Sequence, residues 1–305
     1  MSRKGWLLFA ALCIIWGIPY LLIRVAVREV SPATLVFLRT APAALLLVPF
    51  AARRGQLRPL LGRWKWVLAY TVAELCVPWL LLSRAEQHLS SSLSGLLIAA
   101  VPLLGAVLYR FSSAHEPLGP RRLAGLFVGF GGVAALVGID VGHVDMAAVA
   151  EVGVVVLGYT LGPFIISRRL ADLPNLGVIS ASLVITAVGY APVALTHLPT
   201  HLSWDVGASV TGLTLVCTAL AFVLFFELIL EVGPARSTVI TYINPAVAVL
   251  LGVTVLGEPF TVGMTVGLPL VLAGMVLATS PSPKRPAEPL ATGPPLEIAD
   301  RDQEC

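Results

Sequence analysis

The sequence is poor in charge. Only 12% of its 305 residues are Asp, Glu, Lys or Arg, whereas a water-soluble domain usually carries about 25%. Hydrophobic residues make up 57% of the chain, and its mean hydropathy is +0.90. That leaves too little charge to cover a surface that faces water. The composition therefore excludes an ordinary soluble domain and indicates an all-α membrane protein.

Cysteine is scarce as well. Cys13, Cys76, Cys217 and Cys305 lie far apart, and no paired spacing suggests a disulfide framework or a zinc site. Three of them fall within apolar runs, where we interpret them as small apolar side chains.

Enzyme motifs are absent. The chain has no His-Glu-x-x-His, no Gly-x-Ser-x-Gly and no phosphate-binding Gly-x-x-x-x-Gly-Lys-Ser. His197 and His201 are close in sequence, but we interpret them as solvated loop residues and not as metal ligands. We therefore expect no enzyme activity, no cofactor, no metal site and no nucleic-acid partner.

Apolar runs of about 20 residues dominate the sequence, and a helix of that length spans the roughly 30 Å hydrocarbon core of a bilayer. The run after Met1–Lys4 could be read as a signal peptide, but Trp16-Gly17, Pro19 and the lack of a cleavage site favour a first span. We predict ten transmembrane helices, at residues 5–23, 34–52, 64–83, 92–110, 121–139, 148–167, 177–196, 207–227, 236–256 and 261–280.

The basic residues predict the orientation of these spans. Of the 20 Lys and Arg residues, sixteen fall on the side of the N-terminus, three fall on the other side, and Arg39 lies within a span. Loops rich in Lys and Arg stay in the cytoplasm. We therefore expect a multi-pass protein of the cell membrane with both termini cytoplasmic.

The two halves of the chain resemble each other. A shift of about 142 residues places Glu116-Pro117 on Glu258-Pro259, Gly125 on Gly267 and Gly132 on Gly274. Five spans per half is an odd number, so the halves would be inverted repeats, an arrangement that suits alternating access. We predict repeats at 1–143 and 144–280, followed by a Pro-rich, disordered cytoplasmic tail at 281–305.

Two ionisable residues fall inside predicted spans, where charge is costly and tends to be functional. Glu74 could contact a substrate amine or carry a coupled proton, or it could form a structural pair with Arg39. Arg39 could bind a substrate carboxylate with its fork of donors, lock helices together, or extend to the membrane interface. The sequence leaves these alternatives open.

Other polar groups in the spans could line a central cavity. The candidates are Trp16, Tyr20, Trp79, Tyr159 and Asn244, because a polar group within a span needs a partner. Each could equally be an ordinary packing or interface residue. Gly125-x-x-x-Gly129 and Gly263-x-x-x-Gly267 would let helices approach closely. That contact could lie within the chain or, at the fifth and tenth spans, in a homodimer.

This pattern resembles the EamA-type transporters of the drug/metabolite transporter superfamily. The resemblance covers residues 5–280. It is carried by Trp16-Gly17, by Ser31-Pro32 leading to Arg39, by the stretch 89–102, by Asn244-Pro245 and by Gly257-Glu258-Pro259. It implies a fold of ten helices in two inverted repeats, a central cavity and, commonly, export of amino acids or other small metabolites. Glu74 departs from the general pattern, so the resemblance does not identify the substrate.

The sequence therefore predicts a secondary transporter that exports small metabolites by alternating access. Its substrate-binding residues would be Trp16, Tyr20, Arg39, Glu74, Trp79, Tyr159 and Asn244. Its partners would be a small-molecule substrate, the lipid bilayer and, in one reading, a second copy of the chain. The alternatives are a membrane partner or sensor that keeps the fold without transporting, and a membrane-embedded enzyme.

Overall fold

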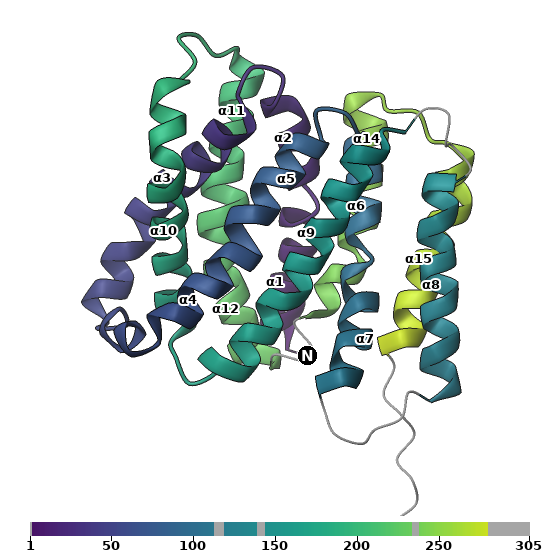
Figure 1. Ribbon diagram of the computed structural model, residues 1–305, viewed down its shortest axis with the longest axis horizontal. Coiled ribbons are helices and arrows are strands. Elements are labelled where there is room, and N and C mark those ends of the chain that lie inside the picture. The colour runs from purple at the N-terminus through teal and green to yellow at the C-terminus, as the bar shows by residue number, and fades with distance from the viewer. Residues whose placement is uncertain (1, 113–118, 139–143, 234–237, 280–305) are drawn as a thin grey trace, which may run out of the picture.

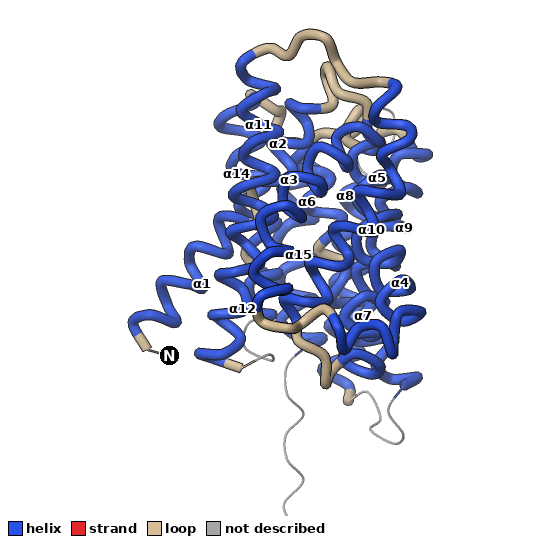
Figure 2. The backbone as a smooth tube through the Cα atoms, turned by 90° about the vertical axis from the view of Figure 1, so that its left-hand side faces the viewer, coloured by secondary structure: helices blue, strands red, loops and turns tan. Residues whose placement is uncertain are grey.

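The computed structural model describes residues 2–112, 119–138, 144–233 and 238–279, and the regular structure in these ranges is all helical (Figure 2). The predicted match at Glu116-Pro117 and the predicted tail at 281–305 lie outside them. The α-helices are α1 (Arg3–Ile15), α2 (Pro19–Ala26), α3 (Pro32–Arg53), α4 (Trp64–Thr71), α5 (Val77–Ala85), α6 (Ser91–Ile98), α7 (Val101–Ser112), α8 (Pro120–Gly138), α9 (Met146–Ile165), α10 (Asn175–Thr196), α11 (Trp204–Thr214), α12 (Ala221–Val232), α14 (Asn244–Leu256) and α15 (Val262–Thr279). The tighter or wider helical turns are η1 (Arg58–Arg63), η2 (Val72–Cys76), η4 (Ile166–Leu170), η5 (Leu215–Leu220) and η6 (Thr238–Tyr242).

Among the described residues, eight helical stretches are long and apolar enough to cross a membrane, and two shorter apolar helices follow them. We number these stretches as segments 1 to 10 in chain order, and each overlaps one predicted span. The all-helical membrane class is confirmed. Crossing by the two shorter helices remains a prediction. The segments are Arg3–Ala26, Pro32–Arg53, Arg58–Ala85, Ser91–Leu108, Pro120–Gly138, Met146–Leu170, Asn175–Thr196, Trp204–Val232, Ile240–Leu256 and Val262–Ala278.

The main packing pairs between segments stay the same when every segment is exchanged for the one five places later. The contacts of segment 4 with segments 1 and 10 (α6 with α2, α7 with α15) are exceptions, because they have no counterpart of similar extent among the described residues. Segment 2 packs on segment 7 (α3 on α10), segment 5 on segment 10 (α8 on α15), and segment 4 on segment 9 (α6 on α14). Segment 3 packs on segment 6 (α5 on α9), and segment 8 packs in the same way on segment 1 (α11 on α2, α12 on α1). Figure 1 shows the α3–α10 pair at one end of the molecule and the α8–α15 pair at the other.

Segment 1 is broken in its middle because a proline restarts the helix. α1 ends at Ile15, and α2 begins with Pro19 in its first turn, where a missing backbone N–H costs no hydrogen bond. The break brings Gly17 against α14, since a Cβ at Gly17 would lie only 2.4 Å from Cγ1 of Val247. A glycine is therefore required where segments 1 and 9 meet.

Segments 3 and 8 each contain a stretch of π-helix, at Val72–Cys76 and Leu215–Leu220. The two stretches begin 143 residues apart, close to the spacing that relates the two halves of the sequence. A π-helical turn widens the helix by one residue and often occurs at functional sites. η2 and η5 thus occupy matching places in the two halves, whereas a third π-helical stretch, η4 at the end of segment 6, has no counterpart in segment 1.

Glycines of α8 and α15 allow these two helices of the same chain to pack closely against each other. A Cβ at Gly274 would lie 2.3 Å from Cα of Gly129, and a Cβ at Gly125 would lie 2.4 Å from the backbone nitrogen of Ala278. The Gly125-x-x-x-Gly129 motif is therefore the surface on which α8 and α15 pack. A homodimer contact at this end of the molecule stays a prediction, and it would need other residues.

Glu258 lies in the turn between α14 and α15, on the face of the bundle opposite the N-terminus, and connects this turn to α6. Its carboxylate accepts hydrogen bonds from the backbone nitrogens of Ser91 (2.7 Å) and Ser92 (3.0 Å), and from Ser92 Oγ (2.5 Å). These nitrogens are free donors of the first turn of α6, which favours negative charge. Glu258 thus caps a helix of the first half from the second half.

Removal of this cap is expected to weaken the fold. Hydrogen bonds to a charged group contribute about 1.5–3 kcal/mol each, so we expect Glu258→Ala to lower the free energy of unfolding by about 2 kcal/mol or more. Thermal unfolding of the full chain in lipid nanodiscs measures the change. The matched control is Glu29→Ala, since Glu29 is exposed on the same face and accepts only the Ser203 N–H, at 2.9 Å. An equal loss in both variants would contradict a special role for Glu258.

Candidate functional site

Arg39 lies at the centre of the polar residues that the bundle buries. Its side chain comes from α3 and is only 8% exposed. The guanidinium carbon stacks 3.7 Å above the ring of Trp79 on α5, and Nε donates a hydrogen bond to Thr218 Oγ1 at 2.8 Å. None of the ion pairs among the described residues includes Arg39. The protein therefore buries this positive charge against an aromatic ring and a hydroxyl, without a carboxylate.

The π-helical turn of segment 8 holds the hydroxyl that Arg39 uses. Thr218 is fully buried, and its Oγ1 donates to the carbonyl of Leu213, five residues earlier, at 2.8 Å. With that proton committed, the oxygen can accept from the Arg39 Nε. Arg39 belongs to the first half and Thr218 to the second, so this hydrogen bond crosses between the halves.

Two tyrosines flank the guanidinium. Tyr20 on α2 and Tyr159 on α9 are close enough to Arg39 to interact with it electrostatically. Tyr20 is 8% exposed and lies beside Gly95, where an added Cβ would be 3.5 Å from Tyr20 Cδ2. Of the seven residues predicted to bind substrate, the structure thus gathers Tyr20, Arg39, Trp79 and Tyr159 into one group.

Glu74 sits in the π-helical turn of segment 3 and faces α9. A Cβ at Gly162 would lie 1.9 Å from Glu74 Oε2, so this glycine leaves the space that the carboxyl fills. Oε2 is buried and has no hydrogen-bond partner among the described residues. Glu74 therefore does not pair with Arg39. Tyr159 lies near both residues.

Trp16 and Asn244 have partners of their own. Trp16 packs against the ring of Phe225 at 4.8 Å and that of Phe222 at 6.3 Å. With its amide oriented to suit its neighbours, Asn244 donates to the carbonyls of Cys13 at 3.2 Å and Ile240 at 3.1 Å. These contacts join α1 to α12 and α14. A substrate-binding role for either residue remains a prediction.

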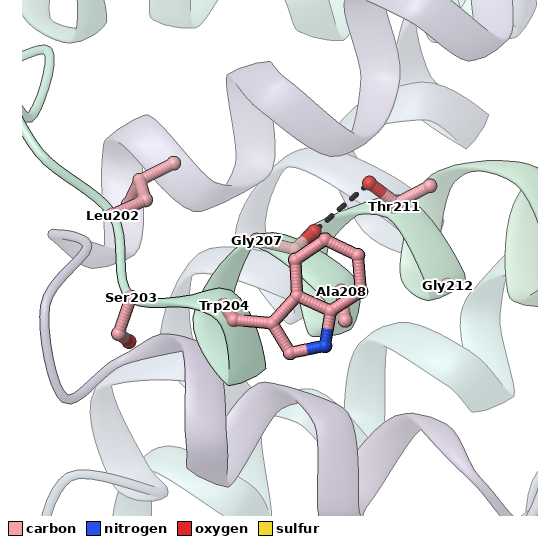
Figure 3. Close-up of a pocket in the computed structure, with 7 residues that line it drawn as sticks. All are labelled: Leu202, Ser203, Trp204, Gly207, Ala208, Thr211 and Gly212. Atoms are coloured by element: carbon pink, nitrogen blue, oxygen red, sulfur yellow. Dashed lines mark hydrogen bonds between the residues drawn. The ribbon is translucent and has the colours of Figure 1, made fainter.

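A pocket of about 580 Å³ lies elsewhere, along the exposed side of α11 (Figure 3). Trp204 projects beside it and is 89% exposed. Its lining includes none of the predicted substrate-binding residues; it is made by Leu202, Ser203, Trp204, Gly207, Ala208, Thr211 and Gly212. The pocket is therefore separate from the polar residues around Arg39.

Two residues of the polar interior, Thr218 and Glu86, were not predicted from the sequence. Thr218 shows no signal in the sequence, because one threonine in an apolar run looks like its neighbours. Glu86 was missed because it follows a span directly and so looks like a solvated loop charge; in the structure it is fully buried. Among the described residues, no group of three or more His, Cys, Asp or Glu side chains could hold a metal ion.

Comparisons with known proteins agree with this architecture. The model of the EamA-like transporter family matches the chain twice, at residues 3–138 and 151–280. The uncharacterized inner membrane transporter YedA of Escherichia coli is 29% identical over 297 residues, with 92% of each chain covered. The uncharacterized transporter YvbV of Bacillus subtilis is 22% identical over 280 residues, covering 90% of this chain and 92% of YvbV.

A solved crystal structure shares the fold. It superposes with a TM-score of 0.64 and 20% sequence identity, covering 92% of this chain and 97% of the other. The two family matches coincide with the two halves that the packing pattern relates. With its helical membrane architecture and its buried polar centre, the chain belongs to the EamA-like transporter family.

Proposed function

We propose that the protein is a secondary transporter that exports small metabolites, amino acids or related compounds, across the cell membrane by alternating access. The observation that carries this proposal is the buried guanidinium of Arg39, which has an aromatic ring and a hydroxyl as partners and forms no ion pair with a carboxylate among the described residues. A buried charge is stable only when it is paired. A substrate carboxylate would supply the missing partner, held by the fork of Arg39 donors.

The position of Glu74 supports the proposal that the substrate carries charges of both signs. Its Oε2 is buried and has no hydrogen-bond partner among the described residues, and Tyr159 is near both Glu74 and Arg39. A compound with an amine and a carboxylate would place the amine toward Glu74 and the carboxylate toward Arg39. Amino acids and related compounds have this character. Tyr20 and Trp79 would then shape the remaining contact surface.

Alternating access is supported by the relation between the halves. The main packing pairs repeat after five segments, the family model matches twice, and two of the three described π-helical stretches, η2 and η5, occupy matching places. With five spans per half, the second half enters the bilayer from the opposite side, and two similar packings can expose one site to either face. The excess of Lys and Arg on the side of the N-terminus favours cytoplasmic termini.

An export assay in intact cells tests the proposal. Cells that express the wild type, Glu74→Gln, Glu227→Gln or an empty vector are loaded with mixed amino acids and dipeptides, and the compounds released are quantified over time. Glu227 pairs with Lys4 at 2.8 Å and is half exposed, so it is the control carboxylate. We expect faster release of a zwitterionic compound by the wild type and by Glu227→Gln, and at least tenfold slower release by Glu74→Gln.

Two other results would change the interpretation. If Glu74→Gln exports as fast as the wild type, Glu74 has a structural role and does not contact the substrate. If every variant matches the vector while the protein is folded in the membrane, export of the tested compounds is excluded. That outcome would favour a membrane partner or sensor that keeps the fold without transporting.

A further inference from the structure

Glu86 is a buried carboxyl that the proposed substrate site does not use. It follows the last residue of α5 and is 0% exposed. Neither carboxylate oxygen has a hydrogen-bond partner among the described residues. The nearest cation does not compensate it, because Arg24 on α2 donates through its Nη1 to the backbone carbonyl of Glu86 and forms no ion pair with the side chain among those residues.

An ionised carboxylate in this position would be costly. Removing such a charge from water without a partner costs several kcal/mol, and a buried acid avoids that cost by binding a proton. Burial is the main reason that the pKa of Glu86 is raised well above its ordinary value, and the negative charge of Glu258 adds to it. Arg24 and Arg39 act in the opposite direction and do not cancel the effect.

The groups around Glu86 come from several elements. Besides Glu258 in the α14–α15 turn, Arg24 on α2 and Arg39 on α3, they include two tyrosines that interact with it electrostatically, Tyr20 on α2 and Tyr159 on α9. Glu86 is therefore near two features: the buried polar residues around Arg39, and the Glu258–Ser91 contact on the face opposite the N-terminus. It is five residues before Ser91, where Glu258 joins α6 across the two halves.

We propose that Glu86 is a proton-binding site and that its protonation holds this face of the transporter closed. The inference rests on the proposed alternating-access function. While Glu258 is seated on α6, Glu86 is sealed from water and keeps its proton on a carboxyl oxygen. When the two halves part at this face, water reaches the carboxyl and the proton passes to it. The carboxylate is then solvated and free to pair with Arg24. The coupled ion is a proton bound outside the substrate site.

The pH dependence follows from linkage. A carboxyl whose pKa is higher in this closed state than in the unfolded chain stabilises the closed state most at low pH. That stability is lost as pH rises through the pKa of the closed state. The wild type should therefore become less stable between about pH 5 and pH 8, whereas an exposed glutamate with a pKa near 4.3 changes little in that range.

Infrared spectroscopy of the full chain in lipid nanodiscs tests the site directly. The carbonyl stretch of a protonated carboxyl is distinct from the bands of a carboxylate. Glu74 is also buried with an unpaired oxygen and can contribute to the same band. We therefore expect the protonated carboxyl band of the wild type at pH 6 to lose part of its intensity in Glu86→Gln and to keep it in Glu29→Gln, on the exposed surface of the same face. We also expect the melting temperature to fall with rising pH, and to fall less in Glu86→Gln than in the wild type.

Several results would overturn the proposal. One is a spectrum of Glu86→Gln identical to that of the wild type, or a wild-type band that disappears near pH 4. Another is a band that disappears when sodium replaces choline, because it would mean that the carboxylate binds a metal ion. If Glu86→Gln does not fold, Glu74→Gln measured at varied pH decides the question: the proposal requires that this variant keeps a protonated carboxyl band above pH 6, and loss of the whole band in Glu74→Gln overturns it.

A transport measurement separates this proposal from the proposed function. In proteoliposomes, Glu86→Gln should exchange labelled for unlabelled substrate at a rate that no longer changes with pH, because glutamine cannot ionise, and a pH gradient should no longer drive accumulation. Gradient-driven accumulation by Glu86→Gln would overturn the proton site while leaving the transporter. If no tested compound is transported by any variant, the proposed function fails and the infrared result still decides whether Glu86 binds a proton.

Discussion

Arg39→Lys is expected to weaken the binding of an anionic substrate by about 10- to 100-fold, because hydrogen bonds to charged groups contribute about 1.5–3 kcal/mol. Lysine keeps the positive charge but loses the planar fork of donors and the flat surface that stacks on Trp79. Uptake of a labelled substrate into vesicles, measured over a range of concentrations, should show a raised KM.

Arg84→Lys is the matched control for this change. Arg84 is exposed and pairs with Glu151 at 3.0 Å, so the same substitution removes a fork of donors outside the polar centre. We expect its KM to equal that of the wild type, since exposed pairs contribute little. If Arg39→Lys keeps a normal KM but unfolds at a lower temperature, Arg39 locks α3 to the π-helical turn at Thr218 and does not bind substrate.

Gly274→Ala is expected to be strongly destabilising, because the two helix backbones of α8 and α15 leave no room for a methyl group. A Cβ at Gly274 would lie 2.3 Å from both Cα and the backbone nitrogen of Gly129, and 2.7 Å from the carbonyl oxygen of Gly125. Backbone atoms cannot rotate away as a side chain can, so the helices must separate. Overpacking of this kind costs about 1–3 kcal/mol. Thermal unfolding in lipid nanodiscs measures the loss.

Gly131→Ala provides the control within the same helix pair. Nothing lies within 4 Å of a Cβ at Gly131, although it is only two residues from Gly129. Alanine is favoured over glycine in a helix by roughly 1 kcal/mol, so this variant should be as stable as the wild type or slightly more stable. Equal destabilisation of both variants would mean that the α8–α15 contact is not as close as the structure has it.

The sequence was sufficient for the class of protein and for the places of its helices. Low charge and apolar runs of membrane length are properties of local stretches, and they predicted segments that overlap those observed, such as 148–167 for Met146–Leu170. The break at Pro19 could not be predicted from proline alone, because Pro42 and Pro49 lie inside the unbroken helix α3. The internal repeat was visible because duplication leaves Pro and Gly in the same order in both halves.

The partners of each side chain were decided by tertiary structure. Arg39 and Glu74 were equally good candidates for a pair in the sequence. They are apart because the π-helical turns aim Thr218 at Arg39 and place Glu74 against Gly162. Glu86 looked like a loop charge, and only the approach of α2 and the Glu258 turn buries it. Hydropathy measures whether a residue prefers an apolar environment or water. Which groups meet depends on how helices far apart in the sequence pack together.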